Sequence, residues 1–142
     1  MGVVAMNTPI GSKDTLEVAG IHIVLAVRDM EEDACSVLPY NLACEYQLHG
    51  EYPVAFDLDF HPENVTVPIN IGVVGEIDSD WKVIANPSMS EDDEFGNAEF
   101  ELSRFERWQE NNHLSPIDKM FLTTLISGFC NRVAREAISN AH

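Results

Sequence analysis

Four side chains suited to acid, base or metal-binding chemistry fall at alternate positions in two neighbouring segments. Asp57, Asp59 and His61 are spaced two residues apart, and Glu45 lies in the segment before them. Side chains two residues apart in a β-strand point to the same face of the sheet. In strands, this spacing would therefore gather carboxylates and an imidazole on one surface, where they could attract a metal ion or a basic protein.

Alternating apolar residues predict the two strands that position these groups. Residues 38–48 have an apolar side chain at every second position, and residues 54–60 repeat the pattern. The segment 50–53 supplies a loop, so we expect a β-hairpin. When the apolar faces of the hairpin are aligned, Glu45 lies opposite Asp57, and all three carboxylates share the other face.

Electrostatic repulsion within this predicted carboxylate cluster indicates that the cluster has a role other than folding. Like charges directly across a strand pair destabilise it by some tenths of a kcal/mol, and neither predicted strand contains Lys or Arg to offset them. Folding alone would not select such an arrangement, so we interpret it as a binding surface. Further acidic residues extend this predicted surface, namely Glu51, Asp78, Asp80, Glu91, Asp92, Asp93 and Glu94.

A metal site is the alternative use of the same residues. Asp57, Asp59 and His61 could ligate a hard or borderline cation from one strand. The spacing is weakly specific, and the chain lacks HExxH, a calcium-binding loop, a phosphate-binding Gly-rich loop and an obvious nucleophile–base pair. We therefore expect no enzymatic activity and no cofactor, with a metal-dependent enzyme as the less favoured alternative.

Charge is the most unusual property of the composition. The 142 residues include 24 Asp and Glu but only eight Lys and Arg, for a formal net charge of -16. Between Asp29 and Ser103 there are 18 of the 24 acidic residues, and Lys82 is the only basic one. This excess disfavours nucleic acid and anionic membranes as direct partners and favours a basic protein surface. Solubility alone is the simpler explanation of the acidity.

The charge pattern predicts a binding function. We expect an acidic protein-binding module that inhibits or sequesters a basic protein, such as one that handles nucleic acid. A nucleic-acid mimic and a toxin-neutralising immunity protein have this physical form, although no motif here identifies either family. A structural or assembly subunit of a larger complex, such as a virus particle, would have the same composition and is the alternative.

The remaining periodicity predicts an α+β fold. We expect an antiparallel β-meander of four or five strands with a C-terminal α-helix packed on one face, a two-layer sandwich. Strands are predicted over residues 21–27, 65–73 and 81–84, in addition to the hairpin, and Pro68 indicates an edge or a bulge. Residues 86–97 are predicted to form an acidic loop between the sheet and the helices.

Two helices are predicted after this loop. Ser103 and Glu106 resemble a capping box for a short helix to about Asn111, with an extended segment over 99–102 as an alternative. Ser115, Pro116 and Asp118 mark the start of the last helix. Its apolar stripe, expected to cover the sheet, comprises Ile117, Met120, Phe121, Leu125, Phe129, Val133 and Ala137.

The length fits a single domain. We expect a flexible segment over 1–14 and one domain over 15–142, with the sheet at about 16–84 and the helices at about 103–140. Three cysteines without CxxC spacing, no signal-peptide pattern and no long apolar run predict a cytoplasmic protein without a membrane segment. Met1 or Met6 could be the true start. A homodimer is one way to bury apolar surface that the helices leave uncovered.

Overall fold

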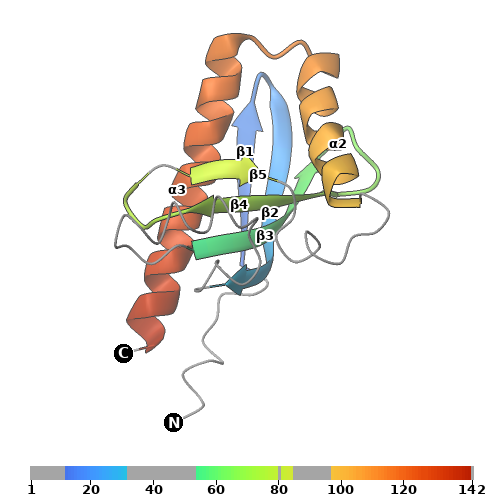
Figure 1. Cartoon of the computed structure of the whole chain (residues 1–142). Helices are drawn as coiled ribbons and strands as arrows, with labels where there is room; N and C mark the ends of the chain where they lie inside the picture. Colours follow the sequence, from blue (N-terminus) through green and yellow to red (C-terminus); the bar gives the residue numbers. More distant parts are fainter. Residues whose placement is uncertain (1–11, 32–53, 80, 85–96, 142) are drawn as a thin grey trace.

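A five-stranded antiparallel sheet forms one layer of the fold, and two helices form the other (Figure 1). The computed structural model describes residues 12–31, 54–79, 81–84 and 97–141. The strands follow one another in the order of the chain, which makes the sheet a meander. Their bounds are β1 Lys13–Val18, β2 Ile21–Glu31, β3 Val54–Pro62, β4 Ile69–Gly75 and β5 Trp81–Ile84. The predicted fold class is therefore confirmed.

The first hairpin was missed in the sequence because it begins inside the segment predicted to be flexible. Val18 pairs with Ile21, so the loop consists of Ala19 and Gly20. Both have positive φ, 53° and 80° respectively, which is the backbone of a two-residue hairpin turn that suits the twist of its strands. Glycine reaches this region without steric cost, whereas Ala19 does not. The sheet consequently starts at Lys13.

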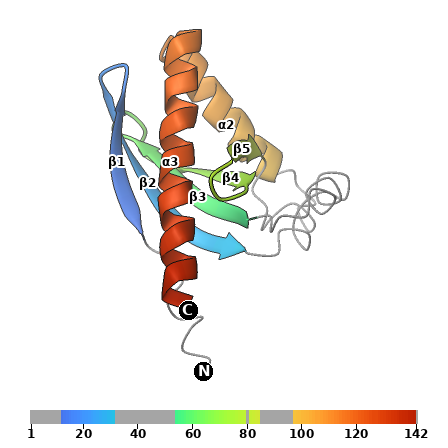
Figure 2. The same ribbon diagram turned by 90° about the vertical axis from the view of Figure 1, so that its left-hand side faces the viewer.

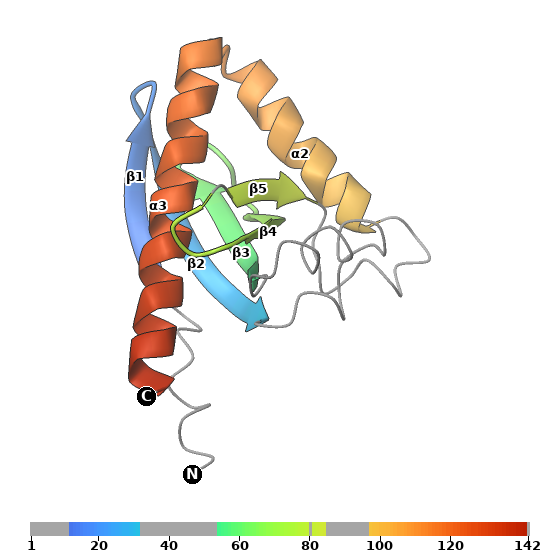
Figure 3. The same ribbon diagram turned by 60° about the vertical axis from the view of Figure 1, so that its left-hand side comes forward.

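The helices are α2, Asn97–Asn111, and α3, Pro116–Ala141, and they meet at one end and diverge over the sheet (Figure 3). The start of α3 is confirmed, since the Ser115 hydroxyl accepts a hydrogen bond from the Asp118 backbone at 3.1 Å, and the Asp118 carboxylate accepts one from the Ser115 backbone. The predicted start of α2 is wrong. Ser103 and Glu106 lie within this helix, and residues 99–102 are helical rather than extended.

The core lies between the two layers. One side chain in two from each strand enters it, and the helices add Phe105, Trp108, Leu122, Ile126, Phe129, Cys130 and Val133. Both tryptophans belong to the core, as their size predicts, and each indole N–H finds an acceptor. Trp81 donates to Asn131 at 2.7 Å, and Trp108 donates to Asn64 at 2.9 Å. Burial raises the pKa of the Cys130 thiol well above its usual range, so Cys130 is a packing residue rather than a nucleophile.

The stripe predicted on α3 is only partly correct. Phe129, Val133 and Ala137 are buried as expected, but Ile117, Met120 and Phe121 are exposed. The buried face near the start of α3 consists instead of Leu122 and Ile126, which a 3.6-residue turn places on the other side of the helix. Apolar residues lie on two sides of α3, and the predicted stripe combined members of both. No helix within the described residues is long and apolar enough to cross a membrane.

Candidate interaction surface

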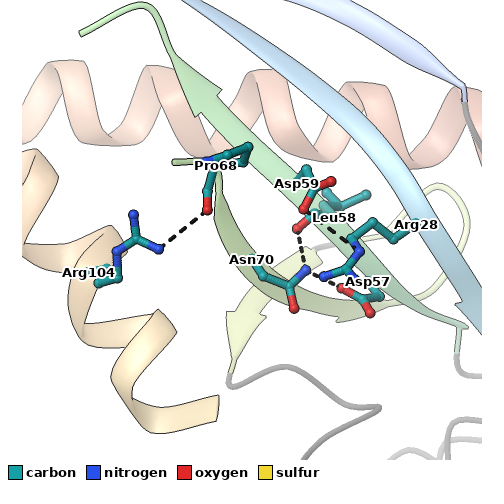
Figure 4. Close-up of polar contacts among 7 residues, drawn as sticks. All are labelled: Arg28, Asp57, Leu58, Asp59, Pro68, Asn70 and Arg104. Atoms are coloured by element: carbon teal, nitrogen blue, oxygen red, sulfur yellow. Dashed lines mark hydrogen bonds and ion pairs between the residues drawn. The ribbon is translucent and has the colours of Figure 1, made fainter. Parts of the chain in front are cut away.

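The predicted binding residues Asp57 and Asp59 lie on the outer face of the sheet, the face that points away from α2 and α3 (Figure 4). The alternation of β3 explains their position, since Phe56, Leu58 and Phe60 are fully buried in the core and the carboxylates between them are half-buried. The prediction that both acidic side chains share a face is therefore correct. Their surroundings, however, differ from those that the sequence suggested.

The partner strands of β3 are the first difference. Both sides of β3 are occupied by described strands, because Asp57 lies opposite Asp29 of β2 and Gly72 of β4. The predicted pairing of Glu45 with Asp57 is therefore wrong, and Glu45 itself lies outside the described residues. The mistake arose because adjacent apolar-alternating segments suggest a hairpin, whereas β3 pairs with the more distant strand β2.

Asp57 is held by an amide that the sequence did not single out. The Asn70 Nδ2 group donates to the Asp57 carboxylate and to the backbone oxygen of Leu58, at 3.0 Å in the second case. Asn70 lies opposite Asp59 on β4 and is only 7% exposed. A hydrogen bond from a buried amide fixes the direction of the carboxylate without neutralising its charge. Asp57 is therefore an oriented anion.

Asp59 has a cationic neighbour. The Arg28 Nε atom lies 3.9 Å from an Asp59 carboxylate oxygen, and both side chains are partly exposed, at 54% and 34%. Arg28 occupies a register shift between Val27 and Asp29, where β2 has one extra residue, and such a bulge redirects a side chain. A long, exposed ion pair of this kind contributes little to stability. It does correct the expectation that no Lys or Arg accompanies the carboxylates on the sheet.

The other predicted site residues are spread over the chain. Asp78 lies in the turn between β4 and β5, and its carboxylate forms an ion pair with Arg135 of α3. Glu51, Asp80 and the run Glu91–Glu94 lie outside the described residues. Asp78 is thus not part of one patch with Asp57 and Asp59.

The alternative metal ligands do not converge. His61 lies on the same face as Asp57 and Asp59, but its Nε2 atom hydrogen-bonds to the Val65 backbone oxygen at 2.9 Å. Within the part of the chain that the structure describes, no group of three or more His, Cys, Asp or Glu side chains could hold a metal ion. The geometry therefore offers no support for metal-assisted chemistry at these three residues.

The charge of the described residues differs from that of the other segments of the chain. All eight Lys and Arg are among the described residues, together with 15 of the 24 acidic residues, so this part carries a net charge of -7. The nine other acidic residues fall in the segments 32–53, 80 and 85–96, which contain no Lys or Arg. Three of the five arginines, Arg28, Arg132 and Arg135, already contact carboxylates of the same chain. The five other Lys and Arg are outnumbered by the 21 other acidic residues.

The chain was also compared with known proteins through family models, curated sequences and solved structures. None of the three comparisons gives a match.

Proposed function

We propose that this chain is an acidic protein-binding module that inhibits or sequesters a basic protein. The observation that carries the proposal is the shortage of internal cations. If each of the eight Lys and Arg neutralised one carboxylate, 16 of the 24 acidic residues would still keep their charge. A basic protein surface supplies the missing cations and forms charge-assisted hydrogen bonds with the carboxylates.

The positions of Asp57 and Asp59 on the outer face of the sheet support this role. On the central strand β3, Asn70 orients Asp57 through a hydrogen bond, and Arg28 lies 3.9 Å from Asp59. Carboxylates that are fixed before binding lose less side-chain entropy when a partner docks, which favours affinity. We therefore propose that these two residues form the ordered centre of the contact, and that the nine carboxylates of the segments 32–53, 80 and 85–96 add long-range attraction.

The sign of the charge also selects the class of partner. A net charge of -16 repels the phosphates of nucleic acid, so direct binding to DNA or RNA is disfavoured. A protein that handles nucleic acid carries a basic surface for those phosphates, and this surface is complementary to the acidic chain. Occupying it would block nucleic-acid binding, which makes inhibition the expected consequence.

Affinity capture from the native host tests this proposal. We expect the immobilised chain to retain one or a few basic proteins at low salt, to lose them as NaCl is raised, and to release them when duplex DNA or RNA competes. The bound proteins are identified by mass spectrometry. Partners of acidic or neutral surface, or complexes that survive high salt and are untouched by nucleic acid, would contradict the proposal.

A second function is favoured by a different observation. Ile117, Met120 and Phe121 are large apolar residues exposed on α3, and contiguous apolar surface marks contacts between proteins. This would suit a structural or assembly subunit of a larger complex, such as a virus particle. Recovery of the native protein in a large assembly, rather than in a complex with one basic partner, would favour this alternative.

A further inference from the structure

The outward side of α3 carries apolar surface that the fold does not use. Ile117 is 76% exposed, Met120 71% and Phe121 49%. Their spacing of three and four residues places them on one side of the helix, opposite the buried residues Leu122 and Ile126. In Figure 2, α3 is the element nearest the viewer, and none of the described strands or the helix α2 crosses its outward side.

Gly128 continues the same side of the helix, two turns after Phe121. A Cβ atom added at Gly128 would have no neighbour within 4 Å, and the residue is exposed. Glycine within a helix lowers the equilibrium constant for helix formation about fivefold relative to alanine. Nothing in the described structure packs closely enough to require glycine here. Ile117, Met120, Phe121 and Gly128 are called the α3 stripe below.

Charge on the exposed part of α3 differs from that of the rest of the chain. Over residues 117–136 the cations Lys119, Arg132 and Arg135 stand against Asp118 and Glu136, and Arg132 and Arg135 also pair with Asp14 and Asp78 of the same chain, so this surface is close to neutral, whereas the whole chain carries -16. Two strongly acidic copies repel each other least when they meet through a surface of this kind. The stripe also has opposite charges near its two ends, Asp118 at the start and Arg132 beyond Gly128.

We propose that two copies of this chain pair through the α3 stripe, with their α3 helices antiparallel. A two-fold axis between residues 124 and 125 brings Phe121 opposite Gly128 of the partner subunit, because 124.5 is the midpoint of 121 and 128. The absent side chain at Gly128 leaves a hollow into which the aromatic ring packs. The same axis brings Asp118 beside Arg132 of the partner subunit, an arginine that also contacts Asp14 of its own chain at 3.4 Å, so opposite charges meet at both ends of the contact.

This pairing is independent of the proposed function, and salt distinguishes the two. The α3 stripe and the outer face with Asp57 and Asp59 lie on opposite layers of the fold. Binding to a basic partner weakens as salt screens the attraction between opposite charges. Pairing of two acidic copies strengthens, because salt screens their repulsion and leaves the apolar contact intact.

Sedimentation equilibrium of the full chain, from micromolar to millimolar concentration at low and high NaCl, tests the pairing. We expect a monomer–dimer equilibrium that shifts toward dimer at high salt. Phe121→Ser and Gly128→Gln are each expected to raise the dimer dissociation constant about tenfold or more, as for residues at an interface centre. The matched control is Val67→Ser, since Val67 is an equally apolar residue, 61% exposed, that lies away from α3.

Gly128→Gln also separates pairing from folding. In a single copy the added side chain meets no neighbour, and glutamine favours a helix more than glycine does. We therefore expect the Gly128→Gln variant to unfold at a higher temperature than the wild-type chain at low concentration, while its dimer dissociates more readily. A wild-type chain that stays monomeric up to millimolar concentration at high salt would overturn the proposal. It would also be overturned by a dimer that resists both α3 substitutions, or by a different protein bound at the stripe while the chain alone remains monomeric.

Discussion

Phe60→Ala is expected to lower the free energy of unfolding by about 3–5 kcal/mol, the cost of deleting a fully buried aromatic side chain. Phe60 is inaccessible to solvent on the inner face of β3. Its ring centroid lies 4.9 Å from that of Phe105 and 5.1 Å from that of Trp108, and both contacts are edge-to-face. Because both neighbours belong to α2, the substitution opens a cavity at the contact between this helix and the sheet.

Urea denaturation followed by circular dichroism measures this loss. Phe60→Leu, which keeps most of the buried volume, is expected to lose less, and Val67→Ala at an exposed position is expected to change stability by about 0.5 kcal/mol or less. A loss below about 1 kcal/mol for Phe60→Ala would show that α2 is not held to β3 in this way.

Asn131→Leu is expected to lower the free energy of unfolding by about 1–3 kcal/mol, the cost of leaving a buried donor without an acceptor. One oxygen, Asn131 Oδ1, accepts both the Trp81 indole N–H at 2.7 Å and the Asp78 backbone N–H at 3.0 Å. Trp81 is 3% exposed, so water does not readily replace the lost acceptor. Asp78 has a φ of 65°, and the second bond helps to hold this turn against α3.

A double-mutant cycle with Trp81→Phe isolates the indole hydrogen bond. In the Trp81→Phe background the buried donor is absent, so Asn131→Leu should cost about 1 kcal/mol less than in the wild-type chain. Equal costs of Asn131→Leu in both backgrounds would show that Asn131 acts without the indole. The free energies come from denaturant titrations of the four variants under one set of conditions.

Local patterns in the sequence predicted much of the fold. Apolar alternation identified β2, β3 and β5, because a strand half-buried against helices needs an apolar side chain at every second position. Ser115 and Asp118 identified the start of α3 because the capping box uses only residues close together in the chain. β4 starts at Ile69, directly after Pro68, which lacks the N–H group that a strand interior requires.

Features that depend on distant contacts were missed. The alternation in β3 does not specify which strand lies beside it, so the predicted partner of Asp57 was wrong. The two apolar stripes on α3 have the same spacing, and only tertiary packing selects Leu122 and Ile126 for the core. Local patterning thus constrains each element but not its neighbours.

The candidate surface was likewise predicted where it depends on one strand and missed where it depends on neighbouring strands. Asp57 and Asp59 were predicted to share a face, and they do, because that depends on one strand. Arg28 and Asn70 were not predicted as their partners, since both come from other strands whose register was unknown. Two features of the sequence could have pointed to these partners. Arg28 directly follows the alternating segment 21–27, and Asn70 is the only amide residue between Ile69 and Val73.

The most direct test of the proposed function compares two variants of equal net charge. Asp57→Asn/Asp59→Asn removes two charges from the outer face and keeps an oxygen that Asn70 can reach, whereas Glu106→Gln/Glu110→Gln removes two charges from exposed positions on α2. Isothermal titration of the captured basic partner at low salt is the measurement. We predict that the first variant raises the dissociation constant about tenfold or more and that the second changes it little, after thermal melts show both folded. Equal effects of the two variants would mean that net charge alone attracts the partner and that Asp57 and Asp59 do not form the contact.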